Sequence, residues 1–117
     1  MKWTEDDESL LIEFVRGNPI IFDNKIGDGN RMESIRQLYS DFAKYAYEGR
    51  CDGNELRGRW QKLRTYYIQL SRAKPQMDYE GKHMKWKHYP NMLFLSTYVA
   101  KEIAKGQAGI IKQVNIL

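Results

Sequence analysis

Between residues 54 and 65 the chain carries side chains that are suited to hydrogen bonding with the edges of nucleic-acid bases. Arginine can pair with guanine through two hydrogen bonds, and asparagine or glutamine can do the same with adenine. Most of these residues recur at intervals of three or four, so on an expected helix they share one face. The candidate base-reading residues are Asn54, Arg57, Gln61, Arg64 and Thr65.

Basic side chains beside and after this face could hold the phosphates of a nucleic-acid backbone. Residues 1–49 carry six basic and ten acidic side chains, whereas residues 50–88 carry ten basic and four acidic ones. A net charge of +4 with this distribution predicts one basic face, which is typical of polyanion binding, although a merely solvated basic surface would look the same. The candidate phosphate-contacting residues are Lys62, Arg72, Lys74, Lys82, Lys85 and Lys87.

Residues that could support catalysis or bind a metal form no recognisable set. Cys51 has no histidine near it in the sequence, and it is better explained as a small residue between two helices. His83 and His88 lie in a lysine-rich segment and lack the spacing of metal ligands. The acidic run at residues 5–8 is explained by the positive end of a helix dipole. We therefore expect no enzyme activity, no metal and no cofactor.

The length and composition restrict the kind of protein. With 117 residues, of which 42% are hydrophobic and 29% charged, the chain is long enough for one small globular domain. We expect this domain over residues 1–105 and a C-terminal extension over residues 106–117. One cysteine excludes an internal disulfide framework, and no apolar run approaches the roughly 18–20 residues of a membrane span. The first residues also lack the pattern of a secretory signal, so we expect a cytosolic or nuclear protein without a membrane partner.

The first predicted helix covers residues 5–16. Thr4 is suited to the N-cap position, and the acidic residues behind it favour the helix start. Leu10 is expected to lie beside the buried face, and Gly17 is expected to end the helix.

The second predicted helix begins near Asn30. Glu33, three residues later, is suited to the reciprocal position of a capping box. Apolar residues then recur at intervals of three and four on one face, and Gly49 is expected to end the helix.

The third predicted helix begins at Asp52, with Glu55 at the reciprocal capping position, and ends at about Ala73, before Pro75. Gly58 in its middle costs about 1 kcal/mol relative to alanine. Closer approach to a groove, close packing against another helix, or simple tolerance would explain that glycine. The core of the predicted three-helix bundle comprises Leu11, Phe14, Val15, Ile35, Tyr39, Phe42, Leu56, Trp60, Leu63 and Tyr67.

A fourth helix is predicted from Pro90, which suits a first turn, to Gly106, which suits a helix end. The segment after it, residues 107–117, mixes apolar residues with a lysine and has no clear period. The residues that this helix is expected to bury are Met92, Leu95, Val99 and Ile103.

Several of these segments together resemble the MADF domain, a Myb/SANT-like domain of transcription factors. Residues 59–67, Arg-Trp-Gln-Lys-Leu-Arg-Thr-Tyr-Tyr, resemble its third-helix signature Arg-Trp-x-x-Leu-Arg-x-x-Tyr. Residues 11–15 and 18–23, Leu-Ile-Glu-Phe-Val and Asn-Pro-Ile-Ile-Phe-Asp, resemble its first-helix region. A third resemblance is to the closing segment of the MADF domain, at Trp86, Tyr89, Met92 and Phe94-Leu95. The resemblance spans about residues 10–95.

The resemblance implies an all-α fold, a Myb/SANT-like three-helix bundle of helix-turn-helix type with an additional C-terminal helix. Together with the basic third helix, it implies sequence-specific binding of duplex DNA by a nuclear transcription or chromatin regulator, with the third helix in the major groove. The family also includes members that mainly contact other proteins. The alternative is therefore a protein-interaction module that recruits a partner to such a complex through the acidic first helix or the C-terminal helix and tail.

Overall fold

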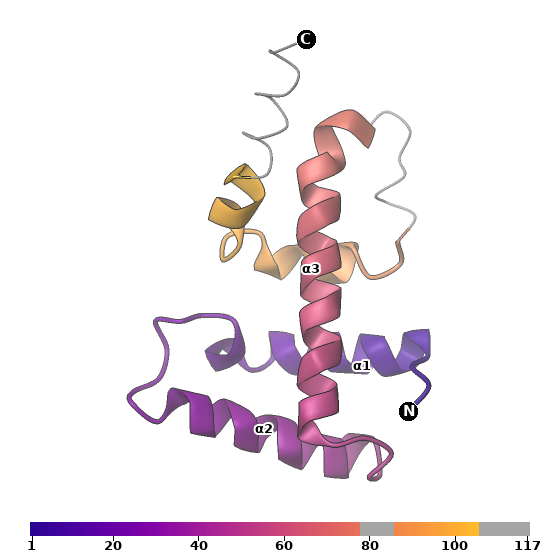
Figure 1. Cartoon of the computed structure of the whole chain (residues 1–117), viewed down its shortest axis with the longest axis vertical. Coiled ribbons are helices and arrows are strands. Elements are labelled where there is room, and N and C mark those ends of the chain that lie inside the picture. Colours follow the sequence, from indigo (N-terminus) through magenta and orange to yellow (C-terminus); the bar gives the residue numbers. More distant parts are fainter. Residues whose placement is uncertain (78–85, 106–117) are drawn as a thin grey trace. The chain divides into compact units, whose positions relative to one another are not determined.

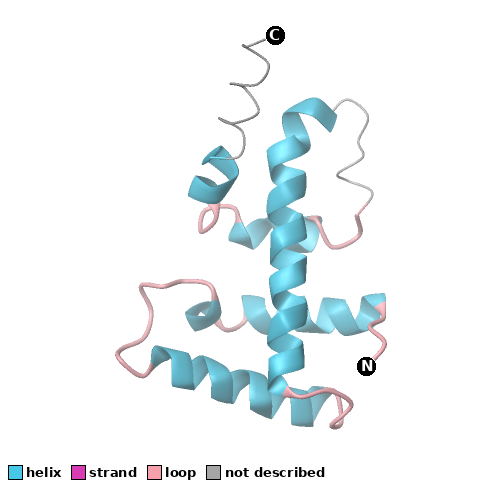
Figure 2. Cartoon of the chain, in the orientation of Figure 1, coloured by secondary structure: helices cyan, strands magenta, loops and turns pink. Residues whose placement is uncertain are grey.

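The computed structural model describes residues 1–77 and 86–105, with only the main chain described for residues 73–77. Within these residues all regular secondary structure is helical and there is no strand (Figure 2). The predicted all-α fold is thus confirmed. The chain divides into two compact units, Met1–Leu63 and Arg64–Leu117, and one long helix contributes residues to both. A domain boundary at residue 105 stays a prediction.

Helix α1 spans Glu5–Arg16 and begins and ends where the sequence predicts (Figure 1). The Asp7 amide donates a hydrogen bond to the Thr4 hydroxyl, and the Thr4 amide donates one to the Asp7 carboxylate, both at 3.1 Å. This reciprocal capping satisfies main-chain donors that a helix start leaves without partners. The C-cap residue is Gly17, and the short 3-10 helix η1 (Pro19–Ile21) follows it.

The buried face of α1 differs by one residue from the predicted face. Leu11 and Val15 are fully buried as predicted, and Ile12 is buried with them. Leu10, which was expected beside that face, is 43% exposed. Leu10 and Ile12 flank Leu11 on opposite sides of the helix at 100° per residue, so helical periodicity alone does not choose between them. The packing of the unit decides it.

Helix α2 spans Arg31–Ala46, with Asn30 as its N-cap residue. The predicted capping box is wrong, because the Asn30 side chain makes no capping hydrogen bond. The Glu33 carboxylate instead forms an ion pair with Arg36, one turn further along the exposed side of the helix. An arginine three residues away competes for the carboxylate that the capping box would need.

The C-terminus of α2 also lies earlier than predicted. The helix ends at Ala46 rather than at Gly49. The Gly49 amide still donates back to the Ala43 carbonyl at 3.4 Å, so the glycine closes the turn that follows the helix. Glu48 and Gly49 both have positive φ, at 53° and 75°, and this left-handed pair redirects the chain toward the next helix.

Helix α3 spans Gly53–Met77. Its predicted capping box is confirmed: the Glu55 amide donates to the Asp52 carboxylate at 2.8 Å, and the Asp52 amide donates to the Glu55 carboxylate at 3.3 Å. The predicted end at about Ala73 is wrong, because the helix continues through Pro75. Proline lacks one main-chain donor, and in the last turn that loss removes a single hydrogen bond without ending the helix.

The core of the first unit contains most of the predicted residues. Phe14 of α1 and Phe42 of α2 are only half-buried, and their rings stack in parallel with centroids 4.0 Å apart. Trp60 of α3 is 1% exposed. The other predicted core residues of this unit are buried as well: Leu11, Val15, Ile35, Tyr39, Leu56 and Leu63.

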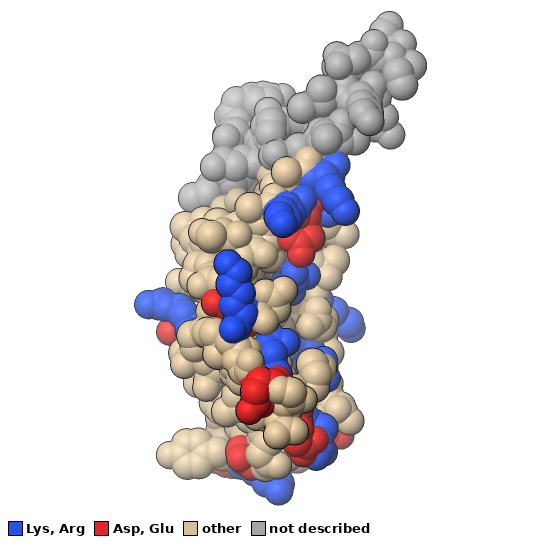
Figure 3. Space-filling model, turned by 90° about the vertical axis from the view of Figure 1, so that its left-hand side faces the viewer, with Lys and Arg blue, Asp and Glu red and all other residues tan. Residues whose placement is uncertain are grey.

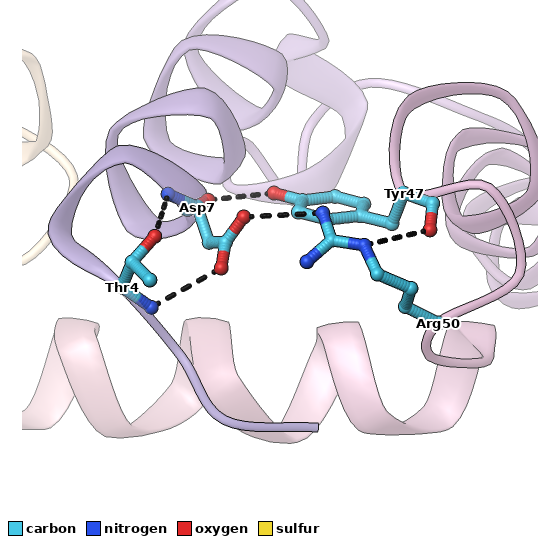
Figure 4. A network of polar contacts seen from close by, with 4 residues as sticks. All are labelled: Thr4, Asp7, Tyr47 and Arg50. Carbon is cyan, nitrogen blue, oxygen red and sulfur yellow. Dashed lines mark hydrogen bonds and ion pairs between the residues drawn. The ribbon is translucent and has the colours of Figure 1, made fainter.

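A polar network ties the start of α1 to the turn after α2 (Figure 4). The Tyr47 hydroxyl donates to the main-chain carbonyl of Asp7 at 2.7 Å. A guanidinium nitrogen of Arg50 donates to the Asp7 carboxylate at 3.3 Å, and another donates to the Tyr47 carbonyl at 3.2 Å. Asp7 therefore caps its own helix and also holds the segment that leads into α3.

The second unit packs the later turns of α3 against residues 86–105. The Tyr67 hydroxyl shares a hydrogen bond with the Ser96 hydroxyl, and the Ser71 hydroxyl shares one with Tyr89, both at 3.1 Å. The rings of Tyr67 and Tyr89 lie 5.1 Å apart. The buried apolar residues of this unit are Tyr67, Ile68, Leu70, Tyr89, Met92, Leu95 and Val99.

The predicted fourth helix is interrupted. Its first part is the 3-10 helix η4 (Pro90–Leu95), residues 96–99 form turns, and residues 100–105 are α-helical. The Ser96 hydroxyl donates to the Leu93 carbonyl at 2.5 Å, and such side-chain bonds compete with the regular helical pattern. Ile103 is half-buried rather than buried. The predicted end at Gly106 lies outside the described residues.

Candidate nucleic-acid interface

The predicted base-reading side of α3 is open along much of its length. Asn54, Gln61 and Thr65 are all exposed, and they lie opposite the buried stripe that contains Trp60. Lys62, on the edge of the same side, is exposed as well. None of these four side chains makes a hydrogen bond within the part of the chain that the structure describes. We call Asn54, Gly58, Gln61, Lys62 and Thr65 the polar stripe of α3.

Gly58 lies in the middle of the polar stripe. A Cβ atom placed on it would meet nothing within 4 Å. Close packing against another helix of the described chain therefore does not explain this glycine. The stripe has a gap at its centre where the main chain of α3 is uncovered, which leaves closer approach to a groove, or simple tolerance, as the explanation.

Arg57 lies beside the polar stripe and shares a pocket with Asn54, the first residue of the stripe. Its side chain is half-buried and lines a pocket of about 220 Å³ where the start of α3 meets α2. Gly53 makes this meeting possible, because a Cβ atom at that position would lie 2.9 Å from the Ser40 amide nitrogen. The sequence showed no sign of this requirement, since nothing local distinguishes Gly53 from any other residue at a helix start.

Arg64 and Arg72 are both bound within the second unit. A guanidinium nitrogen of Arg64 lies 3.2 Å from the Glu102 carboxylate. Arg72 donates two hydrogen bonds, at 2.9 Å and 2.6 Å, to the main-chain carbonyl of Glu102. Ile68, which lies between them on the same side of α3, is buried. Residues 100–105 therefore cover the later part of the predicted DNA-facing side.

The remaining predicted phosphate contacts are only partly described. Lys87 is exposed. The side chain of Lys74 and all of Lys82 and Lys85 lie outside the described residues. The assignment of base-reading and phosphate-contacting roles to all these residues stays a prediction.

Arg59 has a structural role that sequence reasoning missed. Its guanidinium forms an ion pair with the Glu8 carboxylate at 2.5 Å and lies 5.6 Å from the centre of the Trp3 ring. Glu8 and Asp7 thus bind arginines of their own unit, Arg59 and Arg50. Part of the acidic run of α1, a predicted partner surface, is neutralised internally. On the face drawn in Figure 3, basic and acidic side chains are likewise interspersed.

Comparison with known proteins adds to this geometry. The model of the MADF DNA-binding family, described as "Alcohol dehydrogenase transcription factor Myb/SANT-like", matches residues 11–95. The chain belongs to this family. No curated protein and no solved structure gives a match. The matched residues of the MADF chain run from the buried face of α1 to the end of η4, as the resemblance in the sequence predicts.

The MADF family is a family of DNA-binding domains of transcription factors and not an enzyme class. Cys51 is buried, and burial raises the pKa of its thiol. A nucleophilic cysteine needs the opposite shift. Within residues 1–77 and 86–105, no cluster of three potential metal ligands occurs, and no helix has the length and apolar character of a membrane span.

Proposed function

We propose that this MADF domain binds duplex DNA sequence-specifically, as part of a nuclear transcription or chromatin regulator, with α3 in the major groove. The polar stripe of α3 carries the proposal. It combines exposed hydrogen-bonding side chains with an uncovered glycine at its centre. The major groove of B-DNA admits an α-helix and presents a distinct donor and acceptor pattern for each base pair.

The side chains of the stripe suit different parts of the duplex. Gln61 and Asn54 can pair with adenine, and Thr65 can contact either a base edge or the backbone. Lys62 lies at the edge of the stripe, where a phosphate contact is the natural role for an ammonium group. Arg64 can still offer its other guanidinium donors to the DNA while one of them faces Glu102.

Selection of bound sites from random duplexes tests binding and specificity together. Binding titrations of the wild type and two variants then separate base reading from phosphate contact. They use the selected duplex and a scrambled duplex at several salt concentrations. Gln61→Ala should cost about 1–3 kcal/mol on the selected duplex and relax discrimination at one base pair. Lys62→Ala should weaken binding to both duplexes equally and reduce the salt slope by about 0.9.

Lys44→Ala provides the matched control for Lys62→Ala, because Lys44 is an exposed lysine on α2. It should leave both the affinity and the salt slope close to those of the wild type. A wild-type chain that binds no duplex even at low salt would contradict the proposal.

A protein-interaction module is the second candidate function. An open apolar groove of about 530 Å³ lies between α1 and α2. Phe14, Leu38 and Phe42 line it, and Tyr45 at its edge is 89% exposed. Aromatic side chains are enriched at protein interfaces. An absence of duplex binding would favour this second function.

A further inference from the structure

The pocket at the junction of α2 and α3 is lined by a tyrosine whose hydroxyl has no hydrogen-bond partner within the described residues. Tyr39 lines this pocket and is 1% exposed. Its ring contacts Phe14 edge to face, but its hydroxyl makes no hydrogen bond within the described residues. An unsatisfied buried hydroxyl costs free energy that a folded protein normally avoids. A ligand that accepts a hydrogen bond there would remove this cost.

The Tyr39 hydroxyl lies in the electrostatic field of Arg57. Burial raises the pKa of this phenol, and the charge of Arg57 acts in the opposite direction. The phenol therefore stays protonated at neutral pH and can donate. Arg57 lines the same pocket and forms no ion pair within the described part of the chain. Tyr39, whose hydroxyl has no hydrogen-bond partner within the described residues, and Arg57, which has no counter-ion there, thus line one space.

The rest of the lining is compatible with an anion. Ser40 can also donate a hydrogen bond, and Arg36 adds positive charge that it shares with Glu33. The acidic group in the lining, Asp52, already accepts the Glu55 amide as the N-cap of α3. The volume of about 220 Å³ easily holds a phosphate group, since one water molecule takes about 30 Å³ of the liquid.

We propose that this pocket binds one phosphate group of the DNA backbone, with the Tyr39 hydroxyl and the Arg57 guanidinium as its principal donors. The inference rests on the proposed function and changes one role that the sequence predicts. Arg57, predicted from the sequence to read a base, holds a phosphate instead. Its position in a recess formed with α2, where the polar stripe begins at Asn54, suits a contact that positions α3 along the groove rather than one that reads a base edge.

The decisive variants remove one donor each. Tyr39→Phe deletes only the hydroxyl and should leave the melting temperature unchanged or higher, because that group makes no hydrogen bond within the described part of the chain. It should nevertheless weaken binding to the selected and the scrambled duplex equally, by about tenfold. Arg57→Gln should also weaken both equally, and it should lower the salt slope by about 0.9.

Tyr47→Phe is the matched control. The Tyr47 hydroxyl donates to the Asp7 carbonyl, so its loss should lower the melting temperature and leave the DNA affinity of the folded protein unchanged. The pair of tyrosine variants thus separates a ligand-binding hydroxyl from a structural one by opposite effects on stability and affinity.

The possible failures are distinguishable. If the wild type binds DNA and both pocket variants bind it with the same affinity, the pocket inference is wrong and the proposed function stands. The same conclusion follows if Arg57→Gln relaxes discrimination at one base position while the salt slope stays that of the wild type. If the wild type binds no duplex, the pocket inference and the proposed function are both wrong.

A titration with inorganic phosphate, followed through the NMR signals of Tyr39, distinguishes free phosphate from the DNA backbone as the ligand. If the Tyr39 signals shift with phosphate while the DNA affinity of both pocket variants stays unchanged, the pocket binds free phosphate. That result would contradict the contact with the DNA backbone.

Discussion

A guanidinium nitrogen of Arg64 lies 3.2 Å from the carboxylate of Glu102, although 38 residues separate the two in the sequence. Both side chains remain partly exposed, at 30% and 44%. The pair therefore contributes little to stability, about 0–1 kcal/mol, but it places a negative charge beside a proposed DNA contact.

Replacing Glu102 with glutamine should strengthen binding to all duplexes. The amide keeps a polar contact with Arg64 and removes the charge that repels phosphates, so the affinity should rise by about threefold to tenfold at low salt. Binding titrations on selected and scrambled duplexes measure this effect. Glu13→Gln makes the same charge change on the exposed side of α1 and should have a much smaller effect. Equal effects of the two changes would contradict a specific role for Glu102.

Two substitutions at Gly58 separate folding from binding. Gly58→Ala should raise the free energy of unfolding by about 0.5–1 kcal/mol, because alanine favours the helix and its Cβ meets no neighbour. Gly58→Leu should also fold, since the site is open, but its side chain would hold α3 away from the groove. We expect duplex binding weaker by about tenfold or more, each factor of ten being 1.4 kcal/mol. Denaturation measures the stability of Gly58→Ala, and binding titrations measure the DNA affinity of Gly58→Leu. Wild-type affinity in Gly58→Leu would show that α3 does not approach DNA through this position.

Gly53→Ala should destabilise the first unit. The added Cβ would lie 2.9 Å from the Ser40 amide nitrogen and 3.1 Å from its Cα, and both are main-chain atoms that cannot rotate away. Forcing extra atoms into a close-packed site costs about 1–3 kcal/mol. Urea denaturation compares this variant with Gly58→Ala, which makes the same chemical change in the same helix and should have the opposite sign.

The stability of the protein should fall in acid through Asp7. Burial alone would raise the pKa of this carboxyl, but the hydrogen bonds from Thr4 and Arg50 outweigh burial and hold the pKa below its ordinary value. The resulting stabilisation is present above the unfolded pKa of about 3.9 and is lost as the pH falls through the lower folded value. Asp7→Asn should lower the melting temperature at neutral pH and reduce its decline below about pH 4. An unchanged acid decline in the variant would contradict this role.

The sequence by itself determined the existence of the first three helices, the bounds of the first, and most of the core. The bounds of α1 and the capping box of α3 follow from residues no more than three apart, because capping is a local hydrogen-bonding problem. The burial of Trp60 and Tyr39 follows from apolar residues that repeat at the helical period. The family was visible as well, since its signatures are short local stretches.

The tertiary structure decided what depends on contacts between residues far apart in the chain. Helical periodicity placed Arg57 and Arg64 on one polar face, but only the fold shows Arg57 in a pocket with α2 and Arg64 beside Glu102. The requirement for Gly53 likewise arises from the main chain of α2. Local geometry sets which residues share a helix face. Packing sets which neighbour covers that face, and so determines the charge and the free hydrogen-bonding groups that are left for a ligand.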